Sequence, residues 1–380
     1  MELIENLQIR GMSRSFGTAA ALYDFNLDIK GGTFVTLLGP SGCGKSTALN
    51  CLAGLLDLTA GEIILDGSPI HHIPAEKRGF GMVFQNYALF PHLTVIRNVA
   101  YGLESHAMPK TEQDRRIRAA LDLVHLDIDE FGHRYPAQLS GGQQQRLAIA
   151  RTIVLEPKLL LLDEPLSNLD AKLRNEMRIE IKRLHKQLGL TTIYVTHDQA
   201  EAMSLSDLVV VMRKGQIEQV GTPQDIYNCP KSLYVADFMG YSNHLPVTIT
   251  GREGDAWAIQ TENGLNLLAA TTVENIADWT PGARAWACSR PDEVVAEPET
   301  SVNRMRGTVQ LVEYVGKEFE VLVRVAGTEN TQLLIHSEKA PALETSIDFG
   351  VRSDRLLLFP FDANSDSLLT TSRATARVAN

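Results

Sequence analysis

Residues 39–47 read Gly-Pro-Ser-Gly-Cys-Gly-Lys-Ser-Thr, the segment most informative about the fold of this chain. It fits the pattern GxxxxGK[ST], follows the apolar run 34–38 and precedes the helix-like run ALNCLAGLL. A loop of this kind turns successive backbone N–H groups toward a phosphate chain, and the helix N-terminus adds its positive end. The pattern therefore predicts a nucleotide-binding loop made of Gly39, Ser41, Gly42, Cys43, Gly44, Lys45, Ser46 and Thr47.

Two acidic residues complete the predicted phosphate chemistry. The apolar run 159–162 ends in Asp163 and Glu164, at the edge of a sheet where parallel-strand proteins bind their ligands. Lys45 should reach the β- and γ-phosphates, and the Ser46 hydroxyl should bind Mg²⁺. Asp163 suits a second contact on the Mg²⁺ side, and Glu164 is placed to polarise the attacking water. The sequence thus predicts hydrolysis of a nucleotide.

The pattern around these motifs is that of an α/β domain. From residue 3 to about 211, short β-rich runs alternate with helical patterns, which favours a largely parallel core. One helix is predicted after a capping box at Thr111 and Asp114, and another carries an apolar stripe from Leu173 to Leu188 and ends at Gly189. Buried strands are predicted at 34–38, 159–162, 192–195 and 208–212.

After Gly240 the sequence changes to short alternating strands that repeat. A shift of 62 residues places Val247 on Val309 and Arg290 on Arg352 without a gap. Two similar β units, as two small barrels packed together, are expected. The predicted organisation is a nucleotide-hydrolysing domain at 1–238 with helices at about 87–155, a duplicated β-barrel domain at 239–361, and a mobile tail at 362–380.

Composition and charge exclude several classes of protein. Apolar residues make up 44% of the chain, and no apolar run approaches the roughly 20 residues that a membrane span needs. The four cysteines lack CxxC spacing, and the start has no pattern of a secretory signal. The net charge of -10 divides into -2 for residues 1–235 (24 basic, 26 acidic) and -8 for residues 236–380 (12 basic, 20 acidic). A nucleic-acid partner is therefore disfavoured.

The segment Leu139-Ser-Gly-Gly-Gln143 resembles the LSGGQ signature of ATP-binding cassette (ABC) ATPases. The resemblance implies an α/β P-loop NTPase domain with a helical subdomain, and MgATP held between two copies arranged head to tail. The signature would contact the γ-phosphate bound by the partner copy, with its residues Ser140, Gly141, Gly142 and Gln143. The resemblance also implies roles for Gln85 at the Mg²⁺ and water site, Asp170 in the D-loop, His197 as the γ-phosphate switch, and Phe16 stacked on adenine.

Over residues 3–360 the chain is similar to ATPase subunits of bacterial binding-protein-dependent importers, which carry C-terminal OB-like (TOBE) barrels. This implies a peripheral protein on the cytoplasmic side of the inner membrane, with an integral permease bound near residues 85–101 and a solute-binding protein served indirectly. Polyamine-like or small organic solutes and iron(III) are the expected cargo. Exposed contacts to the permease are expected from Tyr87, Leu89, Phe90, Pro91 and His92.

Two alternatives stay open at this stage. A soluble cassette acting on a nucleic-acid or ribosomal machine would present basic and aromatic residues on its β domain, and the charge of -8 opposes it. A sensor that binds ATP without hydrolysing it is opposed by Glu164 and His197.

Overall fold

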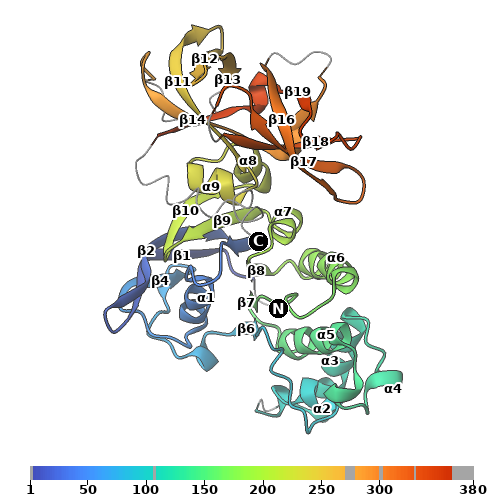
Figure 1. Ribbon diagram of the computed structural model, residues 1–380. Helices are drawn as coiled ribbons and strands as arrows, with labels where there is room; N and C mark the ends of the chain where they lie inside the picture. Colours follow the sequence, from blue (N-terminus) through green and yellow to red (C-terminus); the bar gives the residue numbers. More distant parts are fainter. Residues whose placement is uncertain (1–2, 106–107, 270–278, 299–302, 329–330, 362–380) are drawn as a thin grey trace. The chain divides into compact units, whose positions relative to one another are not determined.

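The computed structural model describes residues 3–105, 108–269, 279–298, 303–328 and 331–361, and the chain divides into two compact units, 1–224 and 225–380 (Figure 1). The division falls before α9 (Leu233–Phe238), whereas the sequence placed the boundary after it, at 238. The physical reason is packing, because Leu233 and Ala236 bury against Trp286 of the second unit. The predicted tail, 362–380, lies outside the described residues.

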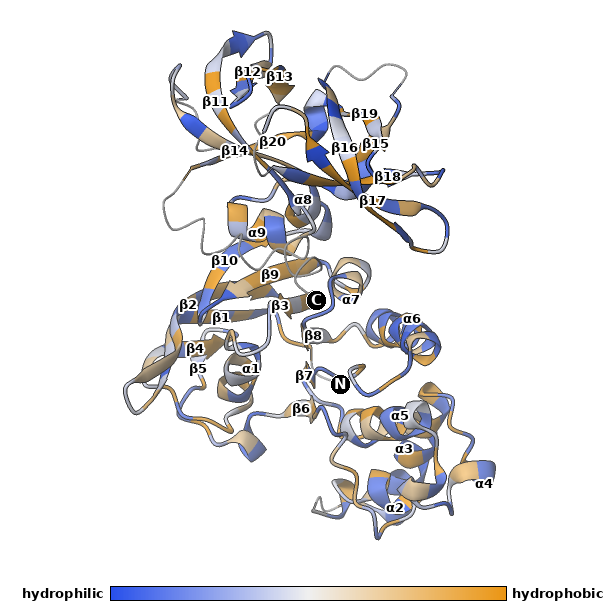
Figure 2. Ribbon diagram, viewed as in Figure 1, coloured by the Kyte–Doolittle hydropathy of each residue, from blue (hydrophilic) through white to orange (hydrophobic). Residues whose placement is uncertain are grey.

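A six-stranded sheet forms the centre of the first unit, in the order β10-β9-β3-β8-β7-β6. The pairs that join β9, β3, β8, β7 and β6 are parallel, and β10 returns antiparallel to β9. Apolar residues run along the buried strands, which confirms the four strands predicted from sequence and is visible for β9 in Figure 2. The strands are β3 (Phe34–Leu38), β6 (Phe80–Val83), β7 (Leu159–Asp163), β8 (Thr191–Thr196), β9 (Leu208–Arg213) and β10 (Gln216–Gly221).

Separate hydrophobic clusters cover the two faces of this sheet. Strand β3 shows the division, because Phe34 belongs to one cluster while Val35 and Leu37 belong to the other. On the Val35 side lie helix α1 (Lys45–Ala53) and an antiparallel sheet of order β2-β1-β4-β5. Its strands are β1 (Asn6–Phe16), β2 (Ala19–Lys30), β4 (Ala60–Leu65) and β5 (Ser68–Pro69), and the turn η1 (Ala75–Lys77) follows them.

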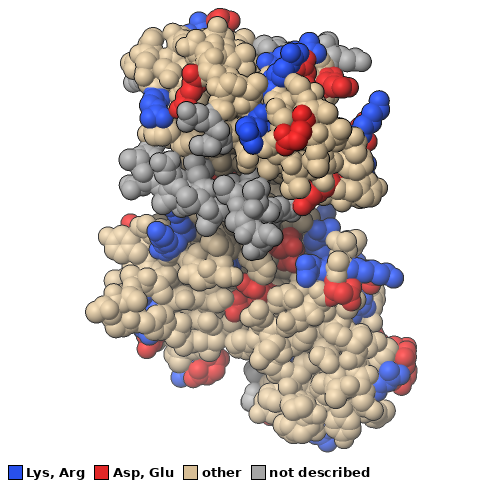
Figure 3. Space-filling model, in the orientation of Figure 1, with Lys and Arg blue, Asp and Glu red and all other residues tan. Residues whose placement is uncertain are grey.

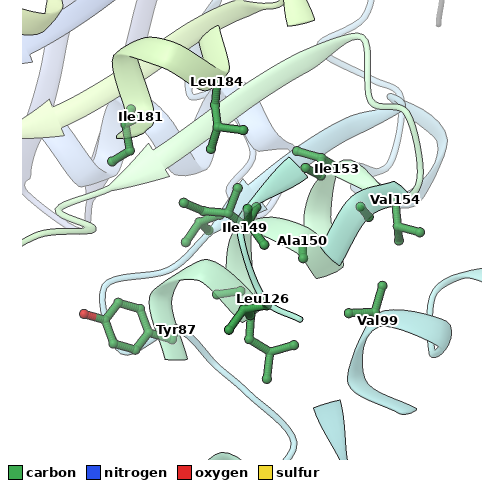
Figure 4. Close-up of a cluster of buried hydrophobic side chains, with 14 of the residues drawn as sticks. Tyr87, Val99, Leu126, Ile149, Ala150, Ile153, Val154, Ile181 and Leu184 are labelled. Atoms are coloured by element: carbon green, nitrogen blue, oxygen red, sulfur yellow. The ribbon is translucent and has the colours of Figure 1, made fainter. Parts of the chain in front are cut away.

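A group of helices occupies the Phe34 side. Ile149 and Ile153 of one helix and Ile181 and Leu184 of another line the same apolar space, and Figure 4 shows these side chains with Val99 and Leu126. The elements are α2 (Val95–Ala100), η2 (Leu103–Ser105), α3 (Lys110–Leu123), α4 (Ile128–Phe131), η3 (Pro136–Gln138), α5 (Gly141–Ile153), α6 (Ala171–Leu188) and α7 (Gln199–Leu205).

Of the two helices predicted from the sequence, α6 ends at the predicted residue, whereas α3 starts at a different one. Helix α6 is confirmed, since Asp170 caps its start and Gly189 ends it with a φ of 64°. The capping box expected at Thr111 is wrong, because α3 begins at Lys110, with Pro109 in the cap position. The predicted apolar face of α3 is nevertheless buried.

The division between the units falls inside α8, and the second unit contains the rest of α8, α9, a five-stranded sheet and a closed barrel. The sheet has the order β13-β12-β11-β14-β20, and the barrel has the order β15-β18-β17-β16-β19. The elements are α8 (Pro223–Asn228), β11 (Asn243–Glu253), β12 (Ala256–Thr261), β13 (Asn266–Ala269), β14 (Arg284–Ser289), η4 (Pro291–Glu293), β15 (Val294–Ala296), β16 (Asn303–Tyr314), β17 (Phe319–Val325), β18 (Gln332–Ser337), β19 (Ser346–Val351), η5 (Ser353–Arg355) and β20 (Leu357–Pro360).

The 62-residue repeat appears as two copies of one strand order that exchange their last strands. Strand β14 and turn η4 recur 62 residues later as β19 and η5. Strand β15, which ends the first copy, pairs with β19 of the second copy, and β20 pairs with β14 of the first. The expectation of two barrels therefore needs correction: in the described residues the second copy closes, while the first remains an open sheet.

Two asparagines tie the copies together in the same way. The amide of Asn243 bonds both backbone groups of Leu334 at 2.7 Å, and the amide of Asn303 bonds both backbone groups of Leu268 at 2.7 Å. Each asparagine side chain thus makes the pair of hydrogen bonds that a neighbouring strand would make, and so links one copy of the repeat to the other.

Candidate functional site

The loop between β3 and α1 has a backbone that only glycine fits well. Gly44 has a φ of 104°, and a Cβ there would lie 2.7 Å from the carbonyl oxygen of Ala21. Lys45 is buried, and its ammonium donates to the carbonyls of Gly39 and Pro40 at 2.9 Å each. The backbone carbonyls of the loop therefore hold the Lys45 ammonium within the loop, where a phosphate-binding loop needs a positive charge.

Ser46 and Asp163 meet across the end of the sheet. The Ser46 hydroxyl donates to Oδ1 of Asp163 at 2.8 Å. Burial raises the pKa of Asp163, while the hydrogen bond from Ser46 acts in the opposite direction. A divalent cation would favour the ionised carboxylate, and hydroxyl, carboxylate and amide oxygens are the hard ligands that Mg²⁺ prefers. The residues present fit the expected cation, with Ser46, Asp163 and Gln85 as its predicted ligands.

Glu164 lies at the centre of the site in a strained backbone conformation. Its φ is 42°, uncommon for a residue with a side chain, and its N–H donates to the carbonyl of Val195 at 3.1 Å. Oε2 of Glu164 lies 3.3 Å from Nδ1 of His197 and accepts from Nε2 of Gln85 at 3.5 Å. The three residues come from the ends of β7, β8 and β6, so the parallel sheet brings them together.

Two residues of the predicted D-loop segment, 167–170, support this arrangement. The Ser167 hydroxyl donates to the carbonyl of Glu164 at 2.9 Å and also contacts the amide of Gln85 at 3.4 Å. The Asn168 amide donates to the carbonyl of Gln85 at 2.9 Å. The resemblance to the family placed both residues in the D-loop but gave them no separate role, since neither residue type is specific for such contacts.

The signature segment begins a helix. Ser140 caps α5 and accepts from the N–H of Gln143 at 3.4 Å, while the Gln143 side chain accepts from the N–H of Ser140 at 2.8 Å. A Cβ on Gly142 would lie 2.8 Å from the end of the Leu173 side chain, so α5 and α6 approach each other closely here. Within one chain, Gly141 and Gly142 thus face the start of α6, where the predicted Asp170 caps the helix through the N–H of Leu173.

The remaining predicted nucleotide contacts differ in exposure. Ser41, Gly42 and Ser46 are exposed and Thr47 is half-buried, whereas Cys43 is buried. Phe16 ends β1, is 48% exposed, and has the Arg14 guanidinium 4.7 Å from its ring centroid. One face of the Phe16 ring is therefore already covered by a cation.

The segment after Gln85 is only partly exposed. Pro91 and His92 are exposed and Leu89 and Phe90 are half-buried, but Tyr87 is buried in the helical cluster, so its expected exposure is wrong. The reason is a tight turn in which Tyr87 and Ala88 have φ values of 63° and 47°. Arg151 holds this turn by donating to the carbonyls of both residues, at 3.0 and 2.7 Å.

A phosphate-binding loop after β3, paired carboxylates after β7 and a histidine after β8 define a P-loop nucleotide-binding protein. The ABC transporter family matches residues 22–167, and the TOBE domain family matches residues 287–359. The chain belongs to the ABC transporter family, as an ATP-binding subunit of an ABC importer with ATPase activity. Among the described residues, no helix is both long and apolar enough to cross a membrane.

Curated relatives match most of the chain. The Fe(3+) ions import ATP-binding protein FbpC of Brucella abortus (strain 2308) is 44% identical over 342 residues, which is 90% of this chain and 92% of that protein. The spermidine/putrescine import ATP-binding protein PotA of Oleidesulfovibrio alaskensis is 44% identical over 335 residues, 86% of this chain and 88% of that protein.

Solved structures match the first unit's fold. A dimeric structure of MJ0796, a bacterial ABC transporter cassette, is 33% identical with a TM-score of 0.52, covering 57% of this chain and 98% of that one. The structure of cbiO1 from Clostridium perfringens, part of the ABC transporter complex cbiONQ, is 30% identical with a TM-score of 0.55, covering 60% of this chain and 91% of that one.

Proposed function

We propose that two copies of this chain bind two MgATP molecules head to tail and that hydrolysis drives solute import through a separate membrane permease. The observation that carries the proposal is the convergence of Ser46, Asp163, Glu164 and His197 at one edge of the sheet, beside the loop that holds Lys45. These groups supply a cation site, a base and positive charge within one region, which is the set that attack of water on a γ-phosphate requires.

Each residue has a distinct role in the proposed reaction. Glu164 accepts a proton from the attacking water as the O–P bond forms and the bond to ADP breaks, and Lys45 stabilises the charge on the transferred group. His197 orients Glu164 and contacts the γ-phosphate, while Gln85 holds the water site. Ser46, Asp163 and Gln85 would hold Mg²⁺, whose charge would neutralise that of the phosphates.

The signature residues support the dimer. The N-terminal N–H groups of α5 at Gly141 and Gly142 form an anion-binding end, yet within the chain these glycines pack beside Leu169 and Leu173 of the α6 region. A second copy facing this surface would offer its own nucleotide to Ser140. The dimeric structure of the related cassette MJ0796 supports such an assembly.

The dimer is tested by substituting the proposed base. The full-length Glu164→Gln protein should form an ATP-dependent dimer in size-exclusion chromatography with light scattering, because the closed state forms and does not turn over. Glu176→Gln, an exposed residue on α6, is the matched control and should behave as wild type. A folded Glu164→Gln protein that binds ATP and stays monomeric would contradict the dimer.

The permease contact and the solute also belong to the proposal. Pro91 and His92, exposed after Gln85, and the half-buried Leu89 and Phe90 would receive the permease on the cytoplasmic side of the membrane. The names of the relatives support iron(III) or a polyamine as cargo. Loss of either radiolabelled iron(III) or radiolabelled spermidine uptake in cells lacking this gene would identify the cargo, and unchanged uptake of both would exclude the two.

The nucleic-acid alternative gains no support from the surface charge. Acidic and basic side chains are interspersed on the face shown in Figure 3. A phosphate backbone is bound by concentrated positive charge, and residues 236–380 carry a net charge of -8 from 12 basic and 20 acidic residues.

A further inference from the structure

Glu201 is a buried carboxylate that the proposed reaction does not use. It lies in the first turn of α7, and only 5% of the residue is exposed. Its Oε2 accepts two hydrogen bonds, from the Tyr194 hydroxyl at 2.8 Å and from the Thr196 hydroxyl at 2.7 Å. A buried carboxylate is costly, so packing alone would favour an apolar side chain at this position.

The bonds of Glu201 enclose the turn that carries His197. Thr196 immediately precedes His197, and its hydroxyl oxygen accepts from the N–H of Asp198 at 3.0 Å. The Asp198 carboxylate in turn accepts from the N–H of Glu201 at 3.0 Å. The backbone on both sides of His197 is therefore fixed by one closed set of hydrogen bonds that begins and ends at Glu201.

A small polar cavity connects this set to the proposed base. The cavity has a volume of about 50 Å³, enough for an ordered water. It is lined by Glu164, Ser167, Arg174, Thr196, His197, Asp198 and Glu201. Displacement of Glu201 would therefore change a space that Glu164 and His197 also line.

We propose that Glu201 is a positioning residue for His197, acting through the Thr196 hydroxyl to hold the imidazole against Glu164. The inference rests on the proposed function, because it assigns Glu201 to the same hydrolytic site. Burial raises the pKa of Glu201, and the bonds from Thr196 and Tyr194 oppose this shift. The turn at His197 requires an acceptor oxygen where Oε2 of Glu201 lies, and the side-chain carbonyl of a glutamine would also supply one.

The test compares four substitutions in the full-length protein. Glu201→Leu removes the acceptor and should lower kcat for MgATP by about tenfold to a hundredfold, with KM changed less than about threefold, since misplaced groups cost rate more than binding. Glu201→Gln should restore kcat to within about threefold of wild type. Thr196→Val should reproduce the loss, whereas Tyr194→Phe, which removes the bond remote from His197, should not.

Thermal unfolding of each variant separates positioning from folding, and Glu176→Leu on the exposed side of α6 is the control. A folded Glu201→Leu with wild-type kcat would overturn the proposal, as would equal losses in Glu201→Gln and Glu201→Leu. If Glu201→Leu does not fold, Thr196→Val decides alone, and wild-type kcat there overturns it. Should Glu164→Gln and His197→Ala also keep full activity, the proposed site itself fails.

Discussion

Nδ1 of His197 lies 3.3 Å from Oε2 of Glu164, although the two residues follow different strands. Adjacent parallel strands β7 and β8 bring them together, and the left-handed backbone at Glu164 turns its carboxylate toward the imidazole. The His197 side chain is 54% exposed, whereas the Glu164 side chain is 18% exposed. His197 is thus open to solvent, while Glu164 stays largely covered.

His197→Ala should lower the steady-state kcat for MgATP by about a hundredfold, because a general base loses most of its effect when its orientation is lost. Binding of a fluorescent ATP analogue should change little, since Lys45 and the loop remain. His133→Ala, an exposed histidine, serves as the control. Unchanged kcat in the folded His197→Ala protein would remove this residue from the site.

Lys45→Ala should weaken ATP binding and abolish turnover, because the buried ammonium at Gly39 and Pro40 is the positive charge held by the loop. Equilibrium binding of a fluorescent ATP analogue measures the loss. Lys172→Ala, exposed at the start of α6, should bind normally. Wild-type binding and turnover in Lys45→Ala would refute the assignment of the phosphate loop.

Cys43 should be alkylated slowly at neutral pH, and its modification should block ATP binding. The thiol is buried, and burial raises its pKa, so the reactive thiolate is scarce near pH 7 and increases as the pH rises. Mass spectrometry of protein treated with N-ethylmaleimide should show the exposed Cys229 modified first. Prior addition of ATP should protect Cys43, and rapid labelling that ATP does not affect would contradict its place in the loop.

Arg151→Ala should destabilise the first unit by about 1–3 kcal/mol, because two carbonyls in the left-handed turn at Tyr87 and Ala88 lose their donor. Arg151→Lys should recover only part of this stability, since an ammonium does not reproduce the planar fork of a guanidinium. Urea unfolding measures both, with the exposed Arg118→Ala as control. Equal stability of wild type and Arg151→Ala would show that the turn needs no such support.

His244→Gln should make the free energy of unfolding less dependent on pH. Burial lowers the pKa of His244 to about 4, so the folded chain keeps the imidazole neutral while the unfolded chain protonates it below about pH 6.5. The stability contributed by His244 is therefore complete above pH 6.5 and is lost as the pH falls toward 4. From pH 7.5 to pH 5 the loss should be about 2 kcal/mol.

The neighbouring acid offsets part of that loss. Oδ1 of Asp237 lies 3.5 Å from Nε2 of His244, and burial raises the pKa of Asp237 to about 6, so the folded chain takes up a proton at this carboxyl as the pH falls to 5, which favours folding. The difference between wild type and His244→Gln isolates the contribution of His244. Urea unfolding at the two pH values measures the effect, with the exposed His133→Gln as control. Equal pH dependence in wild type and His244→Gln would show that His244 titrates normally in the folded chain.

Contiguous motifs made the centre of the site predictable. Lys45 and Ser46 stand in one loop, and Asp163 and Glu164 end one apolar run, so strand periodicity alone placed them at one edge of a parallel sheet. The 62-residue period likewise predicted a duplicated β domain. By contrast, the spacing of Asp198 and Glu201 is typical of a capping box, whereas the Glu201 side chain bonds Tyr194 and Thr196 instead.

The class of fold, the nucleotide loop and the paired carboxylates could be predicted from the amino-acid sequence, because these features depend on neighbours within a few residues. The structure was needed to show that Tyr87 is buried, that Asn168 holds Gln85, and that β15 and β20 exchange between the two β copies. Those contacts join residues far apart in the chain, and their free energy comes from packing and from satisfying buried polar groups, which no local pattern encodes.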